Sequence, residues 1–247
     1  MRIATYNFHK GGRLEHWQNV LAATRADLLF AQEARDPQAF IEDCFAPAGD
    51  ALPHWEGVPR RSWGSAVFVR SGSGGEIAPR SVPGFAGWVV GGKVQLAGTV
   101  FYAFSVHMPT VPGSSYVAQG KRLLRALRRM RLDVPLVLGG DFNLAVGRRP
   151  ESDAIRVSPG ERAWLDAFER GLGLVSSWQA FHPGKALAQT LRWRRNAEPA
   201  YHCDGIFIPV AWQPAIKHAA VHAGDTWTRL SDHNPVEVEL DFPPRSR

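Results

Sequence analysis

Apolar residues occur along the chain in short runs that are separated by turn residues. Eight of these runs have the length and the flanking residues of β-strands. We expect these strands at Arg2–Tyr6, Asp27–Gln32, Ala66–Arg70, Trp88–Gln95, Thr99–Val106, Pro135–Leu138, Gly205–Pro209 and Pro235–Leu240. Apolar residues at helical spacing predict three helices, at Leu14–Arg25, Ser115–Arg131 and Glu161–Arg170. Many strands with few helices predict an α/β fold of two packed sheets with helices outside.

The composition agrees with one globular unit. The chain has 247 residues, 45% of them apolar, with no internal repeat and no long linker, so we expect a single domain over residues 1–247. No apolar run is long enough to span a bilayer, and the first residues begin a strand at once instead of forming a signal peptide. Cys44 and Cys203 allow one disulfide but no disulfide framework, and a reducing cytoplasm is the expected location.

The charge favours an anionic partner only weakly. The chain carries 29 basic and 23 acidic residues, a net charge of +6, and a basic surface attracts polyanions such as nucleic acid. Arg192-Trp193-Arg194-Arg195 places an aromatic ring among cations, which suits a phosphate backbone and a stacked base, although a solvated hairpin explains it as well. The basic residues of the second helix are most simply a solvated face: Lys121, Arg122, Arg125, Arg128 and Arg129.

Polar side chains follow several predicted strands, where loops present functional groups from a rigid scaffold. Asn7 follows the first strand, Glu33 follows the second, and His107 follows the run at Thr99–Val106. A carboxylate there is costly to bury unless it is paired or metal-bound, and such oxygen ligands suit Mg²⁺. Each residue alone also has a non-functional interpretation: Glu33 could be a surface residue, and His107 could be a structural histidine.

Three later segments add acids, an amide and an imidazole. Asp141 and Asn143 lie two residues apart in Gly139-Gly140-Asp141-Phe142-Asn143, so they can point the same way and offer an acceptor for a water proton and a donor to a phosphate oxygen. A simple turn also favours Asp and Asn. Asp232 and His233 precede the last strand and supply a candidate metal ligand and general base, whose tautomer Asp204 could hold.

Taken in order, these segments resemble the endonuclease/exonuclease/phosphatase superfamily, to which deoxyribonuclease I belongs. The matching motifs are Thr5-Tyr6-Asn7, Gln32-Glu33, Ser105-Val106-His107, Gly140-Asp141-Phe142-Asn143, Cys203-Asp204-Gly205-Ile206 and Ser231-Asp232-His233-Asn234-Pro235. Each motif is unspecific alone, but six in order over nearly the whole chain are a specific signal. The resemblance implies a four-layer α/β sandwich of two mixed sheets flanked by helices.

The resemblance also implies a metal and a water site. Glu33 would bind Mg²⁺, which Mn²⁺ could replace, and Asn7 and Asp232 would lie close to the ion. Asp141 would orient or deprotonate the attacking water, and Asn143 would hold the scissile phosphate.

Two histidines complete the implied machinery. His233, oriented by Asp204, would act as general base or stabilise the phosphorane. His107 would hydrogen-bond a phosphate oxygen or protonate the leaving group.

Departures from the superfamily's patterns narrow the substrate. His107-Met108-Pro109 stands where abasic-site endonucleases usually carry a Tyr-Pro-type segment, so the chain resembles the deoxyribonuclease I, toxin-nuclease and sphingomyelinase side. Deoxyribonuclease I supports the equivalent histidine with a glutamate, whereas residues 62–66 contain none.

The sequence thus predicts a metal-dependent phosphodiesterase, first of all a nuclease acting on DNA or RNA. Arg192, Arg194 and Arg195 would contact its substrate. The alternative is a phosphatase or phospholipase C-type diesterase acting on lipid or small-molecule phosphate esters. A binding scaffold without chemistry is disfavoured, because all the expected acid, amide and imidazole positions are retained.

Overall fold

The strands of the protein form two six-stranded sheets. The computed structural model describes residues 1–40, 53–70, 75–149, 157–196 and 199–242, and all statements on the fold refer to these ranges. The first sheet has the order β11-β12-β1-β2-β4-β3, with β11 at Ile216–Val221, β12 at Val236–Leu240, β1 at Arg2–Asn7, β2 at Leu28–Ala34, β4 at Gly64–Val69 and β3 at His54–Gly57. The second has the order β5-β6-β7-β8-β10-β9, with β5 at Glu76–Pro79, β6 at Val89–Leu96, β7 at Thr99–His107, β8 at Leu136–Asp141, β10 at Asp204–Pro209 and β9 at Leu174–Ser176.

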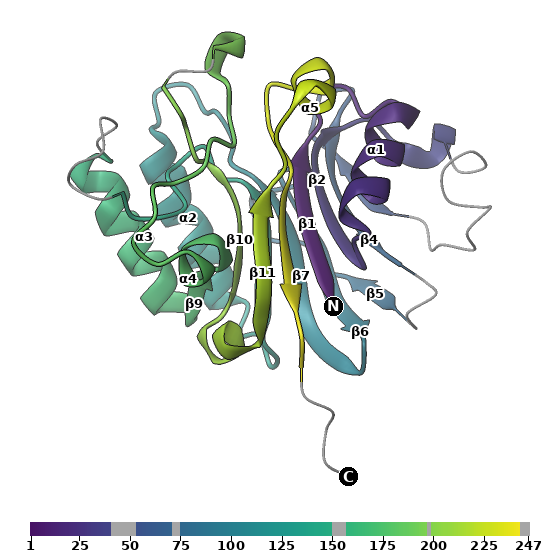
Figure 1. The fold of residues 1–247 in the computed structure, drawn as a ribbon. Coiled ribbons are helices and arrows are strands. Elements are labelled where there is room, and N and C mark those ends of the chain that lie inside the picture. Colours follow the sequence, from purple (N-terminus) through teal and green to yellow (C-terminus); the bar gives the residue numbers. More distant parts are fainter. Residues whose placement is uncertain (41–52, 71–74, 150–156, 197–198, 243–247) are drawn as a thin grey trace.

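Both sheets are mixed, and they pack face to face with helices outside (Figure 1). β1 runs parallel to β2, and β7 runs parallel to β8, while the other neighbours are antiparallel. The helices are α1 at Leu14–Thr24, α2 at Tyr116–Arg129, α3 at Pro159–Leu172, α4 at Ser177–Phe181 and α5 at Asp225–Leu230. α1 covers the outer face of the first sheet, and α2 and α3 cover that of the second. The predicted four-layer sandwich is therefore confirmed.

Three apolar clusters hold the layers together. The central one lies between the sheets and includes Phe30, Val137 and Ile206. Trp17 belongs to the cluster under α1, and Trp164 belongs to the cluster under α2 and α3. Each sheet packs against the other sheet on one face and against helices on the other. The central strands are therefore apolar on both faces, and they appear in the sequence as continuous apolar runs.

Four strands and two helices escape sequence analysis. β3, β5, β9 and β11 are three to six residues long, and β5 and β11 expose much of their length at or near sheet edges. α4 and α5 have only five and six residues. Such short elements carry no strong periodicity, and their structure is determined by their tertiary neighbours.

The eight predicted strands all form, and several continue further than their apolar runs. β8 was expected to end at Leu138 but reaches Asp141, because residues 139–141 pair with β7 on one side and β10 on the other. No helix of the described ranges is long and apolar enough to cross a membrane. Cys203 is a buried free thiol, and Cys44 lies outside the described residues.

Candidate active site

Strand pairing places three of the predicted site residues side by side in the second sheet. His107 ends β7 and is paired with Asp141 of the parallel strand β8, and Asp141 is paired in turn with Asp204 of β10. Adjacent strands lie about 5 Å apart, so the three side chains are direct neighbours. The pairing requires the close backbone approach of Gly140, since a Cβ atom there would lie 1.8 Å from the carbonyl oxygen of Val106.

The first sheet presents its polar residues at the same edge. Asn7 ends β1, and Glu33 lies near the end of β2, where the pairing with β4 shifts register between Ala31 and Ala34. Glu33 has a left-handed backbone with φ of 50°, which is uncommon outside glycine. This local irregularity turns the carboxylate toward the second sheet, where its Oε1 lies 3.5 Å from His107 Nε2.

A buried hydrogen-bond chain fixes the two sheets against each other beneath the site. Thr5 Oγ1 donates to Gln32 Oε1, and Gln32 Nε2 donates to Ser105 Oγ, at 3.2 and 2.8 Å. Ser105 Oγ in turn donates to the carbonyl oxygen of Ala31. Sequence analysis did not assign these residues a role beyond the motifs around them, yet they set the relative position of Asn7 and His107.

His233 and Asp204 form a close buried pair. His233 Nδ1 lies 2.9 and 3.0 Å from the two oxygens of Asp204, and both side chains are almost completely buried. Burial lowers the pKa of His233, but the charge and hydrogen bond of Asp204, together with the charge of Asp141, raise it to about 10. The other ring nitrogen of His233, Nε2, lies 3.9 Å from Asp141 Oδ2 and 3.8 Å from Asp232 Oδ1.

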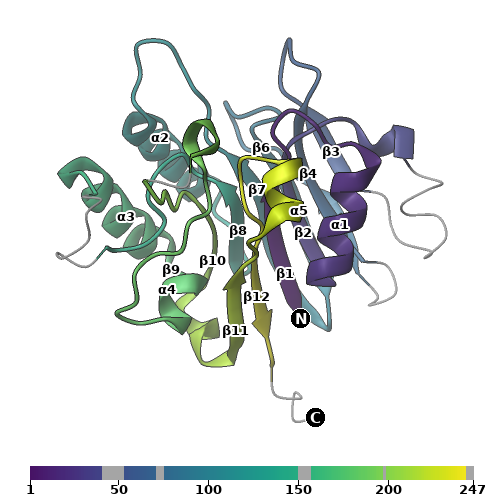
Figure 2. The same cartoon turned by 45° about the horizontal axis from the view of Figure 1, so that its top comes forward.

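The loop of residues 231–235 is hydrogen-bonded to β1 of the first sheet. Ser231 Oγ donates to the carbonyl oxygen of Asn7 and accepts from the amide of His233, at 2.8 and 3.0 Å. Asp232 then faces His9, whose Nδ1 lies 2.8 Å from Asp232 Oδ1. His9 lies two residues after Asn7, and its side chain remains partly exposed beside Asp232. Figure 2 shows this rim, where α5 and the ends of the central strands come forward.

Asp141 is the most connected carboxylate of the site. Its Oδ1 accepts from the amide of Asn143 at 2.9 Å, and its Oδ2 accepts from Asn7 Nδ2 at 3.0 Å. Burial and the neighbouring charge of Asp204 raise its pKa to about 7. Asn143 has φ of 50° and sends its amide Nδ2 toward the carbonyl oxygen of Met108 at 3.3 Å, which leaves it half-buried beside Asp141.

His107 is enclosed by two indole rings. Its ring centroid lies 5.4 Å from that of Trp63 and 5.0 Å from that of Trp88. Burial lowers its pKa to about 4, although the nearby charge of Glu33 opposes this. Residues 62–66, which contain no glutamate, contribute the ring of Trp63 to this aromatic wall, and Glu33 is the carboxylate next to His107.

The donor set fits a divalent cation beside Glu33. Glu33 Oε2 is buried and has no hydrogen-bond partner, while Asn7, Asp141 and Asp232 surround the same region. Several desolvated carboxylates in one place repel each other, and a cation compensates that charge.

Among the described residues, the His, Cys and acidic side chains whose ligand atoms all lie within 4.8 Å of one another are instead Cys203, Asp204 and His233. Both Asp204 oxygens are already engaged by His233, and burial raises the pKa of the Cys203 thiol well above its usual value. A protonated thiol is a poor ligand for a hard cation. This grouping therefore suits the orientation of an imidazole better than the binding of a metal.

The three arginines expected at the substrate have different surroundings. Arg192 is buried, and its Nη2 donates to the carbonyl oxygens of Trp227, Ser231 and His233 at 3.2, 2.8 and 3.1 Å. Its Nη1 donates to Asn234 Oδ1. The expectation that Arg192 contacts substrate disagrees with this geometry, because the side chain is buried and both Nη atoms donate inside the fold. Arg194 and Arg195 are exposed on the same segment.

A pocket of about 300 Å³ adjoins Asn143, and sequence analysis did not foresee it. Tyr116 from α2 and Trp193 and Tyr201 from the segment before β10 line it, together with Arg149. Trp193 and Tyr201 are 56% and 38% exposed, unusually high values for such large rings in this protein. The Arg-Trp-Arg-Arg segment was the one sequence signal near this pocket, and its aromatic residue is the part that lines it.

Comparisons with known proteins agree with this geometry. The model of the Endonuclease/Exonuclease/phosphatase family matches residues 4–233. An AP endonuclease from Archaeoglobus fulgidus is similar in structure, with a TM-score of 0.71 at 16% identity over 98% of this chain and 100% of the other. A 3′ phosphatase from Neisseria, bound to a product DNA hairpin, has a TM-score of 0.70 at 22% identity, again over 98% and 100%. No curated protein sequence matches the chain.

Proposed function

Since the chain belongs to the Endonuclease/Exonuclease/phosphatase family, whose members hydrolyse phosphoester bonds, we propose that it is a metal-dependent nuclease that hydrolyses DNA or RNA phosphodiesters. The observation that carries this proposal is the meeting of two imidazoles, four carboxylates and two amides at one edge of the two sheets. They are His107, His233, Glu33, Asp141, Asp204, Asp232, Asn7 and Asn143.

Each group has a role that its surroundings support. Asp141 faces His233 Nε2 and accepts from Asn143, so it is placed to orient a water molecule. Asp204 accepts a hydrogen bond from His233 Nδ1–H and so fixes the orientation of the imidazole ring. Nε2–H of His233 would then donate to the negative charge that develops on the phosphate oxygens. His107, neutral at physiological pH because its pKa is low, offers a hydrogen bond to a phosphate oxygen or to the leaving oxygen.

Glu33, with Asn7 and Asp232 nearby, would hold the divalent cation. When bound, that ion supplies positive charge next to phosphate oxygens and lowers the cost of the charge that in-line attack creates there. We propose Mg²⁺, with Mn²⁺ as a substitute, because the donors are carboxylate and amide oxygens.

Nucleic acid is the proposed substrate for two reasons. The chain has a net charge of +6, and the exposed Arg194 and Arg195 directly follow Trp193, which lines the pocket next to Asn143. Similar solved structures point the same way, since one is a 3′ phosphatase bound to product DNA and another is a 3′-5′ exonuclease from Neisseria meningitidis, 24% identical over 98% of this chain and 100% of the other with a TM-score of 0.69.

A second candidate is a diesterase or phosphatase for a lipid or small-molecule phosphate ester. The observation that favours it is the pocket lined by the aromatic rings of Tyr116, Trp193 and Tyr201, which could enclose one apolar group next to the phosphate. Such concave, aromatic sites are typical of small ligands.

One activity panel tests both candidates. The purified chain is assayed with Mg²⁺, with Mn²⁺ and with excess chelator on plasmid DNA, single-stranded DNA, RNA, a generic phosphodiester and sphingomyelin, and Glu33→Gln serves as the control for contaminating nucleases. The proposal expects metal-dependent cleavage of DNA or RNA that the variant lacks. Hydrolysis of the lipid or small ester without cleavage of nucleic acid would establish the second candidate, and full activity in chelator would refute both.

A further inference from the structure

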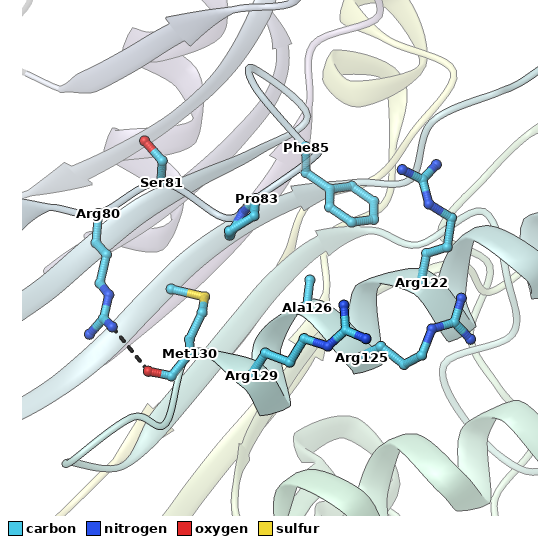
Figure 3. Close-up of a pocket in the computed structure, with 9 residues that line it drawn as sticks. All are labelled: Arg80, Ser81, Pro83, Phe85, Arg122, Arg125, Ala126, Arg129 and Met130. Carbon is cyan, nitrogen blue, oxygen red and sulfur yellow. Dashed lines mark hydrogen bonds between the residues drawn. The ribbon is translucent and has the colours of Figure 1, made fainter.

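A basic groove lies along α2, away from the catalytic cluster. It has a volume of about 480 Å³ and runs between the helix and the loop that joins β5 to β6 (Figure 3). Four arginines line it, and no acidic residue does. Its lining side chains are Arg80, Ser81, Pro83, Phe85, Arg122, Arg125, Ala126, Arg129 and Met130.

Two of these arginines are held by the fold. Arg80 donates to the carbonyl oxygen of Met130 at 3.0 Å and lies 5.1 Å above the ring of Tyr102. Arg122 donates to Gln119 Oε1 at 2.9 Å and lies 5.4 Å above the ring of Phe85. Neither contact neutralises the guanidinium, so both charges remain available at the two ends of the groove.

The groove arginines have no acidic partner among the described residues. Within the described ranges, no carboxylate is within ion-pair distance of Arg122, Arg125 or Arg129. By contrast, Arg148 pairs with Asp166 and Glu169 at 2.6 and 2.7 Å.

α2 itself contains no acidic residue, although it carries one lysine and four arginines. Arg122, Arg125 and Arg129 are three and four residues apart, the spacing at which like charges on a helix repel each other. Sequence analysis took this face to be solvated, but repelling cations that share a groove are explained better by an anion that binds between them.

The spacing of the three arginines fits a chain of phosphate groups better than a single anion. Arg122 and Arg129 are seven residues apart, which on a helix is about 10 Å. Guanidinium groups bind phosphate oxygens through two parallel hydrogen bonds, so a row of three suits successive phosphates of a polymer.

The groove also connects with the catalytic edge. α2 begins at Tyr116, which lines the pocket beside Asn143, and the loop opposite leads to Trp88, whose ring packs on His107. Arg122 is about 9 Å along the helix from Tyr116. A strand that reaches the catalytic cluster could therefore continue into the groove.

A membrane surface fits these observations less well. The exposed large hydrophobic residues of the described ranges are Val100, Trp193, Tyr201 and Val210, and none lines the groove. Peripheral membrane sites usually insert apolar side chains beside their basic residues.

Resting on the proposed nuclease function, we propose that the α2 groove is a second binding site for the phosphate backbone of the nucleic-acid substrate, beyond the bond that is cleaved. Arg122, Arg125 and Arg129 provide the contacts to successive phosphates. The site gives affinity without base specificity, because guanidinium–phosphate contacts carry no direct sequence information.

Binding without cleavage tests this proposal directly. We would measure fluorescence anisotropy of a labelled single-stranded oligo(dT) of about 20 nucleotides in excess chelator, over a range of salt concentrations. R122Q/R125Q/R129Q should bind about 10- to 100-fold more weakly at low salt. The slope of log K against log salt should fall by about 2, from three lost contacts at about 0.7 each. R122K/R125K/R129K keeps the charges and should recover most of that slope.

A matched control removes the same number of charges outside the groove. K121Q/R128Q/R131Q changes the same helix and its end, and should bind nearly like the wild type. Equal weakening in the groove and control variants would overturn the proposal and leave the nuclease function standing. Loss of binding to phosphatidylserine vesicles, with unchanged binding of the oligonucleotide, would overturn it in favour of a membrane. A wild type that neither binds nor cleaves nucleic acid would refute the nuclease function itself.

Discussion

Two residues of the proposed active site adopt a left-handed backbone conformation that residues other than glycine usually avoid. Glu33 and Asn143 both have φ of 50°, and both lie where a strand meets the cluster. Such a conformation costs free energy and persists only where the surrounding contacts impose it. Here the register shift of β2 imposes it on Glu33, and the bond from the Asn143 amide to Asp141 imposes it on Asn143. The left-handed backbone aims both side chains at the same point between the sheets.

The first prediction concerns Glu33, whose Oε2 is buried without a partner. Glu33→Gln removes the negative charge but preserves the shape of the side chain, so the fold should survive. Loss of outer partners of metal ligands already costs about 10- to 100-fold in affinity or activity, so loss of a ligand should lower activity by at least about 100-fold. Thermal unfolding with and without Mg²⁺ checks the cause. The wild type should be stabilised by the ion more than the variant, and equal stabilisation would show that Glu33 is not a ligand.

A second prediction treats His233 and Asp204 as one unit. His233→Ala should lower turnover by about 10²- to 10⁴-fold, the usual contribution of a positioned acid or base. Asp204→Asn should be partly defective through the same imidazole, so the double variant should be little slower than His233→Ala alone. Kinetics of all three variants, measured well below their melting temperatures, form the test. Defects that multiply would show that the two residues act independently.

At the scale of elements, the loop before β12 depends on a buried cation. Arg192 ties this loop to the end of α5 through three carbonyl oxygens and Asn234, and its amide donates to the carbonyl oxygen of Asp232 at 2.8 Å. The same loop carries Asp232 and His233. The arginine therefore positions two residues of the proposed active site.

The third prediction follows from that tie. Arg192→Met fills a similar volume but leaves buried carbonyl oxygens without a donor, which costs about 1–3 kcal/mol. For a chain of this size, the melting temperature should fall by about 2–4 °C for each kcal/mol. Differential scanning calorimetry checks this, with the exposed Arg194→Met as the matched control. If Arg192 contacted substrate instead, both variants would keep their melting temperature and Arg192→Met would only weaken binding.

Arg192 also shows that the sequence does not predict which basic side chains are buried. The motif residues were identifiable because strand ends are visible as apolar runs, and register then brings His107, Asp141 and Asp204 together. Whether a basic side chain points outward is not encoded in any local pattern, so Arg192 and Arg194 looked alike in the sequence. The same limit applies to edge strands such as β11, whose residues alternate weakly and whose pairing with β12 decides their structure.

At the scale of the whole molecule, burial of ionisable groups links stability to pH. The catalytic edge is formed by the ends of both sheets, so its histidines are enclosed from two sides. His202, just before Cys203, is such a group outside the phosphate-facing cluster. Its Nδ1–H donates to the carbonyl oxygen of Ala188 at 2.6 Å, while Nε2 is buried without a hydrogen-bond partner. Burial lowers the pKa of His202 to about 4.

The last prediction is therefore a loss of stability in mild acid that depends on His202. The unfolded chain takes up a proton at this residue near the ordinary histidine pKa of about 6.5, whereas the folded chain does so only near 4. Between these values the unfolded state binds more protons, so the free energy of unfolding falls as the pH is lowered from about 6.5 to about 4. The loss due to His202 is on the order of 3 kcal/mol. His202→Asn keeps a donor near Ala188 but cannot titrate, so its stability should depend less on pH across this window. Urea unfolding from pH 7 to pH 4.5 measures the difference, with the half-exposed His218→Asn as the matched control. Parallel pH profiles for the wild type and His202→Asn would show that His202 does not carry this effect.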